Sequence, residues 1–410
     1  MSIDLNSGEV RKNPYPAYGE LRHTASAVYD AHRNMWYVGR YNDVFEVLRN
    51  SKNFSNEYSG VEFTLLGADG AKHTRSRNMV QSAFTSERIA SLDNALRSLT
   101  DKLVAPIADR GECELIGEFA ALIPTSGIAW MLGIDDTRLS DLRRWSAAIL
   151  KSTGARRKTR KNQTRPGLLH RWSKALLESA DTRRKKIKNH TDTTSDIAEC
   201  RAYFIDHFNQ AKQKPNGGWL TDSLIKNSES DSLTTEEMLD IGFLLIVAGT
   251  ETTTNLIGNA ALFLARNPRI QDQIRENPQL LKPFIEEVLR FDSPVQQRPR
   301  IATSPTKVGN VDIPSGARIE VLIGSANRDL EKFPDADQFR LDRESNRHLT
   351  FGAGPHFCLG AELARLEAFA ALYALTTHLP KMTLASPLGE IDYPDNLRRR
   401  GPRQLHIKFC

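Results

Sequence analysis

A ten-residue segment near the carboxyl end, residues 351–360 (FGAGPHFCLG), surrounds one cysteine with three glycines, a proline and two phenylalanines. Glycine reaches backbone angles that other residues avoid and proline fixes its own, so this segment predicts a tight, preset loop. After it, apolar residues recur at three- and four-residue spacing from Ala361 to Ala370, which predicts a helix. Cys358 is therefore expected just before a helix N-terminus, where N–H groups and the helix dipole stabilise a thiolate.

The spacing F-G-x-G-x-H-x-C-x-G resembles the haem-binding loop of the cytochrome P450 family at every fixed position. The resemblance implies that Cys358 is the metal ligand of haem b, with Phe351, His356 and Gly360 around the cofactor. A buried structural cysteine is the ordinary interpretation of a lone Cys, but the fixed neighbours favour the haem ligand. A zinc site is not expected, because no second Cys or His pair lies nearby at ligand spacing.

The whole chain has 410 residues, enough for a large core. Its four cysteines lie far apart and predict no disulfide framework, which fits a reducing cytoplasm. The first 21 residues are polar and contain Pro14 and Pro16, and the strongest apolar run, 241–248, is short, so we expect neither a signal peptide nor a transmembrane anchor. The resemblance implies one domain over residues 1–410, mainly α with small β-sheets and a long central helix, as in the α-rich prism of the family.

The net charge of +6 comes from one segment: residues 151–190 hold fourteen Lys and Arg but only two acidic residues. Helices are expected at 115–132, 138–150 and 196–211, and by resemblance the last two flank a substrate lid, here the long basic segment 152–192. Such a lid would attract an anionic substrate, an acidic carrier domain or an acidic membrane surface. A solvated loop is the plainer interpretation. Nucleic acid is not expected, because no recognition motif accompanies the charge.

Thr234 and Glu237 form a capping box that predicts the start of a helix of about 50 Å, ended by Asn267-Pro268. Within it, residues 248–252 (AGTET) resemble the A-G-x-[D/E]-T pattern of the family's distal helix. The resemblance implies that Ala248 and Gly249 leave room for dioxygen beside the haem. It also implies that Thr252 donates a hydrogen bond to the oxygen substrate, while Glu251 relays protons.

A plainer property of threonine competes with the role of Thr252, because a threonine in isolation often bonds back to its own helix. Gly249 and the four threonines of residues 250–254 cost about 2 kcal/mol relative to alanine. Weak helix formers in the middle of a buried helix suggest a local opening made for function.

Residues 73–77 (HTRSR) place His73 and Arg77 four apart, hence on one helical face. The two haem propionates need cationic partners, and the resemblance assigns this role to His73 and Arg77, joined by Arg300 and by His356 of the cysteine loop. A solvated basic face is the alternative. Substrate-pocket positions implied by the resemblance are Leu244, Val247, Val295, Gln297 and Leu397.

Glu287 and Arg290 are three residues apart on an expected helix at 284–291, and an exposed pair at this spacing contributes little. The resemblance, to the family's E-x-x-R motif, implies instead a buried network completed by Arg343. We assign these three residues a structural role in holding the cysteine loop.

The predicted activity is monooxygenation, with hydroxylation, epoxidation and oxidative coupling left open, on a small organic substrate of bacterial secondary metabolism. No flavin domain or phosphate-binding glycine loop is present in the sequence, so electrons from NAD(P)H are expected through a separate ferredoxin and ferredoxin reductase. A peroxide-driven haem enzyme is one alternative, although Glu251-Thr252 argues against it. A haem-binding sensor without turnover is the other.

Overall fold

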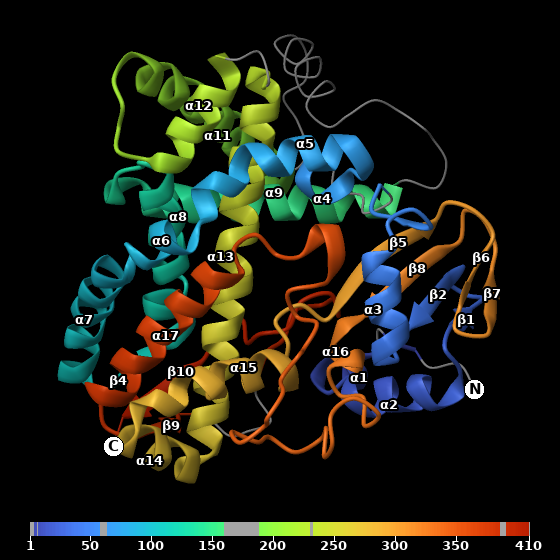
Figure 1. Ribbon diagram of the computed structural model, residues 1–410. Coiled ribbons are helices and arrows are strands. Elements are labelled where there is room, and N and C mark those ends of the chain that lie inside the picture. Colours follow the sequence, from blue (N-terminus) through green and yellow to red (C-terminus); the bar gives the residue numbers. More distant parts are fainter. Residues whose placement is uncertain are drawn as a thin grey trace. The chain divides into compact units, whose positions relative to one another are not determined.

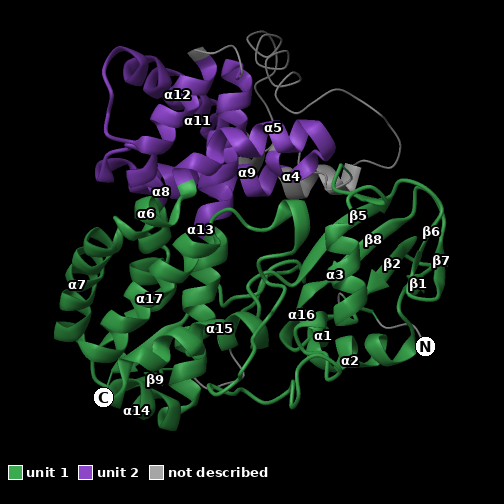
Figure 2. Cartoon of the chain, in the orientation of Figure 1, with its two compact units in different colours: residues 1–58, 84–127, 251–410 green, residues 59–83, 128–250 purple. Residues whose placement is uncertain are grey.

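The computed structural model describes residues 4–5, 7–57, 64–159, 188–229, 233–385 and 391–409. The chain forms two compact units, shown in different colours in Figure 2. Unit 1 comprises Met1–Tyr58, Phe84–Gly127 and Glu251–Cys410, and unit 2 comprises Ser59–Ala83 and Ile128–Thr250. Most of the basic segment 152–192 lies outside the described residues, and the expectation of a single domain stays a prediction.

Unit 1 contains a five-stranded sheet in the order β1-β2-β8-β5-β3 (Figure 1). Its strands are β1 (Val28–Asp30), β2 (Met35–Val38), β8 (Arg318–Leu322), β5 (Gln297–Ala302) and β3 (Phe54–Ser55). Only β2 and β8 pair in parallel. Their β-branched and aromatic residues suit a pleated, half-buried surface, and Val38 and Val321 are fully buried in one core cluster with Val44 of α3 (Tyr41–Arg49). The sheet thereby fixes β5, which carries Arg298 and Arg300.

Two smaller sheets complete the β-structure of unit 1. The strands β4 (Glu112–Glu114), β10 (His406–Phe409) and β9 (Met382–Leu384) form an antiparallel sheet, and β6 (Thr306–Val308) pairs with β7 (Val311–Ile313). The other helices of unit 1 are α1 (Gly8–Lys12), α2 (Tyr15–Thr24), α6 (Ser86–Ala90), α7 (Asp93–Arg110), α14 (Pro268–Glu276), α15 (Leu281–Phe291), α16 (Ile323–Ala326) and α17 (Ala361–Thr377).

Unit 2 is helical. It contains α4 (Thr64–Gly67), α5 (Gly70–Gln81), α9 (Leu139–Thr159), α11 (Lys188–Gln213) and α12 (Trp219–Glu229). Helix α11 packs closely on α13 (Thr235–Arg266). A Cβ added to Gly242 of α13 would lie only 3.0 Å from the Phe204 ring of α11. The helices expected at 138–150 and 196–211 are thus present and longer than predicted.

The helix expected at 115–132 is interrupted. Residues Ile116–Ala120 form a π-helical turn, and α8 runs from Leu122 to Leu132. Pro124 accounts for the break, because it has no N–H to continue the hydrogen bonds of a preceding helix and it lies in the first turn of α8, where that N–H is not needed. The single-helix prediction overlooked this signal.

Helix α13 begins as predicted, with Glu237 N–H donating to Thr234 Oγ1 over 3.2 Å and Thr234 N–H donating to Glu237 Oε2 over 2.9 Å. It is α-helical from Thr235 to Arg266, so the predicted local opening is wrong at the level of the backbone. Among the described helices α13 is the one long and apolar enough to cross a membrane. However, 78% of its most apolar window is buried inside the protein, as in the core helix of a globular fold.

Candidate functional site

The cysteine loop is set by glycine backbone geometry. Gly352 and Gly354 have φ of +76° and +71°, angles that favour glycine. A Cβ on Gly354 would lie 2.8 Å from the Arg49 Cα, so the loop packs tightly against α3. The Cys358 N–H donates to Phe351 O over 2.8 Å, closing the loop, and Gly360 is the N-cap of α17. Cys358 is exposed and stands just before a helix N-terminus, as predicted.

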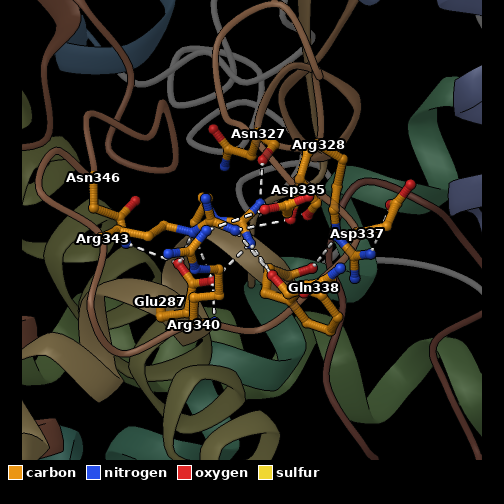
Figure 3. A network of polar contacts seen from close by, with 12 residues as sticks. Glu287, Asn327, Arg328, Asp335, Asp337, Gln338, Arg340, Arg343 and Asn346 are labelled. Atoms are coloured by element: carbon orange, nitrogen blue, oxygen red, sulfur yellow. Dashed lines mark hydrogen bonds and ion pairs between the residues drawn. The ribbon is translucent and has the colours of Figure 1, made fainter.

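Glu287 is the centre of a buried network behind this loop (Figure 3). It accepts two hydrogen bonds from the Arg290 guanidinium, at 2.7 and 2.8 Å, and two from Arg343 Nε, at 2.9 and 3.1 Å. The Arg340 N–H and Asn346 Nδ2 donate to the same carboxylate at 2.9 and 3.1 Å. The structure therefore brings the three residues Glu287, Arg290 and Arg343 together.

Asn327 connects this network to the cysteine loop. Arg290 Nη1 donates to Asn327 O over 2.9 Å. The Asn327 amide, fully buried, donates to Thr350 Oγ1 over 3.0 Å and accepts the Leu349 N–H over 2.7 Å. Since Thr350 immediately precedes the loop, the buried ion pair and the start of the loop are held in one chain of hydrogen bonds.

Glu286 forms a second brace, between α15 and α17. Arg365 donates to its two oxygens at 2.6 and 2.9 Å, and His348 Nε2 lies 3.2 Å away. Burial raises the pKa of Glu286, but the hydrogen bonds from Arg365 and His348 outweigh burial and lower it to about 2. The Arg365 guanidinium also lies 4.5 Å from the centre of the Phe351 ring, so this brace contacts the loop directly.

Glu251, in α13, forms an ion pair with Arg399 of the C-terminal segment. Burial raises the pKa of the Glu251 carboxyl, and the positive charges of Arg399 and Arg298 oppose that rise. A carboxyl whose pKa is raised toward neutrality is suited to moving protons.

The threonines around Glu251 have different surroundings. Thr250 Oγ1 donates to Ile246 O over 2.7 Å, so this threonine bonds back to its own helix. The same alternative for Thr252 stays open. Thr253 hydrogen-bonds Glu367, a carboxyl of α17 that is 1% exposed. Burial raises the pKa of Glu367 well above its usual value, because burial penalises the charged carboxylate. Thr252 lies between Glu251 and Thr253 on the continuous helix.

Gly249 belongs to unit 2, where a Cβ would lie 2.6 Å from Ile128 Cγ1 of α8. Close packing of α13 on α8 therefore requires glycine at this position, whether or not dioxygen also uses the space. Ala248, next to it, belongs to the same unit.

The predicted propionate residues fall in both units. His73 is buried in α5 of unit 2, which also carries Arg77. Arg300 is 4% exposed on β5 of unit 1, and His356 lies in the cysteine loop. All four are positioned by regular elements or by the preset loop, and their role stays a prediction.

The predicted pocket residues of unit 1 already have partners in the protein. Val295 belongs to the core cluster of the five-stranded sheet. Gln297 Nε2 donates to Tyr18 Oη over 3.3 Å, and Leu397 packs in a cluster with Tyr18 and Tyr37. Leu244 and Val247 are each 5% exposed in unit 2. Internal packing accounts for the burial of Val295, Gln297 and Leu397, so a pocket role for them stays a prediction.

Sequence reasoning missed Arg298, Arg399 and Glu367, which the structure places beside predicted site residues. The signal for Arg399 was available as the run of three arginines at 398–400. Arg298 had the signal of alternation, since it lies two residues before Arg300 on a strand. Glu367 carried no local signal, because an acidic residue inside an amphipathic helix is ordinarily exposed.

The cysteines differ in their fitness to bind iron. Burial raises the pKa of Cys113 to about 12 and also raises that of Cys200, which opposes a thiolate at either position. Cys358, by contrast, is exposed and precedes the N-cap of α17, which fits a cofactor that needs one thiolate from the protein. Among the described residues there is no group of three or more His, Cys, Asp or Glu that could hold a metal ion. Two arginines lie in the same unit as Cys358: Arg298, which is partly buried, and Arg300, which is buried. Their positive charges suit the carboxylates of a haem.

A cavity of about 490 Å³ in unit 1 lies near the carboxyl end of α13, lined among others by Tyr15, Asn259, Arg266 and Arg400. It contains none of the predicted site residues, and we do not assign the chemistry to it.

Comparison with known proteins gives a consistent answer. A family model described as Cytochrome P450 matches residues 11–379. "Cytochrome P450 109" of Bacillus spizizenii is 36% identical over 374 residues, covering 91% of this chain and 86% of the relative. The "Mycinamicin IV hydroxylase/epoxidase" of Micromonospora griseorubida is 30% identical over 408 residues, covering 95% and 94% of the two chains. The solved structure of P450BioI with a fatty-acyl carrier protein has a TM-score of 0.82, 28% identity and 99% and 100% coverage.

Proposed function

Because the chain belongs to the cytochrome P450 family, and is therefore a haem-dependent monooxygenase, we propose a role for each of its candidate site residues. The haem iron, when bound, activates O2 so that one oxygen atom enters the substrate and the other leaves as water. Electrons come from NAD(P)H through redox partners, as is standard for bacterial members of the family. The residues below bind, orient and deliver protons.

Cys358 is the proposed iron ligand. The observation that carries this proposal is the loop geometry: a cysteine outside the core, at the N-terminal end of α17, in a loop closed by the Cys358 N–H and braced by the Glu287 network. Backbone N–H groups and the helix dipole stabilise the thiolate. Phe351, Gly360, Ala248 and Gly249 would border the porphyrin. His73, Arg77, Arg300 and His356 would pair with its propionates.

Glu251 and Thr252 are the proposed proton-delivery pair. Support comes from the raised pKa of Glu251 and from its ion pair with Arg399, which holds the carboxyl in one place. In this account Glu251 takes protons from solvent, and Thr252 Oγ1 orients the oxygen substrate by a hydrogen bond.

The substrate is a small organic molecule, and we propose hydroxylation or epoxidation of a bacterial secondary metabolite. The name of the Micromonospora relative includes both reactions. A carrier-bound or anionic substrate is a second option, because the P450BioI structure holds an acyl carrier protein and the segment 152–192 of this chain is strongly basic. Leu244, Val247, Val295, Gln297 and Leu397 remain the proposed pocket positions.

A ferredoxin and its reductase are the proposed electron donors, in the cytoplasm. Phe357, beside Cys358, is 43% exposed and offers an apolar contact for the donor, with the exposed Lys332 also in unit 1.

The test compares wild type with Cys358→Ser and, as a matched control, Cys113→Ser. Wild type and C113S should show the thiolate-type Soret band of the reduced carbon monoxide complex, and C358S should lack it. With a surrogate ferredoxin system, wild type should convert a substrate found by a spin-state screen in an NADH-dependent reaction. Product formation with peroxide alone would favour the peroxide-driven alternative, and substrate binding without any product would favour the sensor.

A further inference from the structure

Three consecutive arginines in the C-terminal segment each bind a different carboxylate. The backbone is held beside residues 294–296, with Gln296 N–H donating to Arg398 O and Arg400 N–H donating to Pro294 O, both over 3.0 Å. Extended chain sends successive side chains in opposite directions. Arg398 Nη2 accordingly reaches Glu320 Oε2 over 2.8 Å and Arg400 Nε reaches Asp292 Oδ1 over 2.5 Å, while Arg399 pairs with Glu251.

A fourth arginine near them has no carboxylate of its own. Arg298 lies on β5, opposite Val321 of β8, and its side chain points to the same face of the strand as that of Arg300. It is partly buried, and within the described part of the chain no hydrogen bond or ion pair to its guanidinium is found. The two carboxylates whose charges act on it, Glu251 and Glu320, are already paired with Arg399 and Arg398.

The surroundings of Arg298 make this unpaired charge costly. Burial lowers the pKa of Arg298 to about 10, and the charge of Arg399 acts in the same direction. At pH 7 the guanidinium is still charged, and a desolvated charge without a counterion destabilises a fold unless an anion binds. A planar guanidinium fork suits a carboxylate, which it binds through two parallel hydrogen bonds.

The position of Arg298 indicates where that anion would lie. The other charges that act on it come from Cys358, in the proposed iron-binding loop, and from Glu251, on the proposed oxygen-side helix. Both residues, Cys358 and Glu251, belong to unit 1. A ligand contacting Arg298 would therefore lie beside the haem or be part of it.

We propose that Arg298 binds a carboxylate in the cofactor and substrate region. Arg398 and Arg399 already pair with the two neighbouring carboxylates, so the counterion of Arg298 has to come from a ligand. The proposal rests on the proposed function only for the presence of haem. Two carboxylates fit this chemistry: a haem propionate, in addition to any bound by Arg300, and the acidic group of a substrate such as a fatty acid.

The first arm of the test addresses the propionate. Wild type, Arg298→Gln and Arg298→Lys are loaded with protohaem or with its dimethyl ester, and the rate of haem transfer to apomyoglobin is measured. The control is Arg269→Gln, an exposed arginine of α14. We expect R298Q to lose protohaem about tenfold faster than wild type, with no such difference for the ester. R298K should lie between the two, because lysine keeps the charge but not the planar fork.

The second arm addresses the substrate. Dodecanoic acid and hexadecanoic acid, and their methyl esters, are titrated into the same variants, and Kd is read from the haem spin-state change. We expect R298Q to weaken binding of the acids about tenfold and to leave the esters within twofold.

An effect in either arm supports the proposal and identifies the carboxylate. Equal behaviour of R298Q and R269Q in both arms overturns it, and so does an R298Q loss that is as large for the esters as for the acids, because the defect is then one of packing. Neither arm requires turnover. A failure of catalysis with intact haem binding would therefore count against the proposed function and not against this assignment.

Discussion

Two charged networks in unit 1 are built from the same residue types and behave differently. In the first, one carboxylate, Glu287, accepts hydrogen bonds from Arg290, Arg343, Arg340 and Asn346, and the remaining N–H groups of Arg290 reach backbone carbonyls of Asn327, Ala336 and Gln338. In the second, the three arginines Arg298, Arg398 and Arg399 share two carboxylates, Glu251 and Glu320.

The two networks differ in whether every buried charge has a partner within the protein. The Glu287 network satisfies its buried charges from within the protein, so it needs no ligand and holds the cysteine loop in one shape. The Glu251 network leaves one cation over, and its members other than the buried Glu320 are partly exposed. A saturated network is suited to support, whereas an unsaturated one is suited to binding and proton movement.

Breaking the saturated network should have the largest effect. Glu287→Gln removes the negative charge and leaves two buried arginines short of a counterion, so we expect a loss of about 3–5 kcal/mol in the free energy of unfolding. Denaturant unfolding measures it, with haem content as a second readout. Glu236→Gln, which removes an exposed ion pair with Arg201, serves as control and should cost less than about 1 kcal/mol. Equal losses for both variants would falsify the distinction.

Acid should release the second brace of the loop. Because the folded pKa of Glu286 is depressed to about 2, its contribution to stability is present above the unfolded value near 4.5 and is lost as pH falls toward 2. After allowance for the partial exposure of Glu286, we expect the free energy of unfolding of wild type to exceed that of Glu286→Gln by about 2 kcal/mol at pH 6. This difference should disappear near pH 2. A gap independent of pH would show that packing, not charge, accounts for it.

Removing one charge from the unsaturated network should change chemistry more than stability. In Arg399→Gln the pKa of Glu251 rises further, because a charge that lowered it is gone. The acidic limb of the product-formation profile should move to higher pH, and product formed per O2 consumed should fall about threefold. Arg399→Lys keeps the charge and should retain the wild-type profile. If all three proteins had the same pH profile of product formation, Arg399 would have no role in proton delivery.

The smallest effect at low pH is expected at Glu367, a buried carboxyl whose pKa burial raises. At pH 4 the free energy of unfolding of Glu367→Gln should lie within about 0.5 kcal/mol of the wild-type value, because the carboxyl is largely protonated in the unfolded chain as well. As pH rises, wild type should lose stability relative to Gln, because the unfolded Glu ionises while the folded one does not. Calorimetry at pH 4 and pH 7 checks the sign, and a wild type that gained stability instead would mean that Glu367 is ionised in the fold.

Local patterns predicted much of this structure. The capping box at Thr234, the glycine-rich loop before α17 and the Glu287–Arg290 spacing each specify a short-range geometry that one sequence can show. The interruption at 115–132 was also local, in Pro124, but apolar periodicity concealed it.

The rest depends on contacts distant in sequence. Glu251 and Arg399 are 148 residues apart, and nothing near either one indicates the other. Gly249 was explained by space for dioxygen, whereas its neighbour Ile128 is on a different helix. Pairings of this kind arise from the tertiary fold, so a pattern along the chain identified the helix but not its partners.

The alternation of Arg398, Arg399 and Arg400 makes the spacing of the C-terminal segment matter as much as its composition. Inserting two residues just before Leu397, with the chain upstream kept in place and the backbone still docked on residues 294–296, would bring Leu397 to the position that Arg399 now occupies. A different side chain would then face α13, and Glu251 would lose its guanidinium without any change at residue 251 itself. Length variation upstream of Arg398 is thus a route by which related chains can retune proton supply while every catalytic residue stays the same.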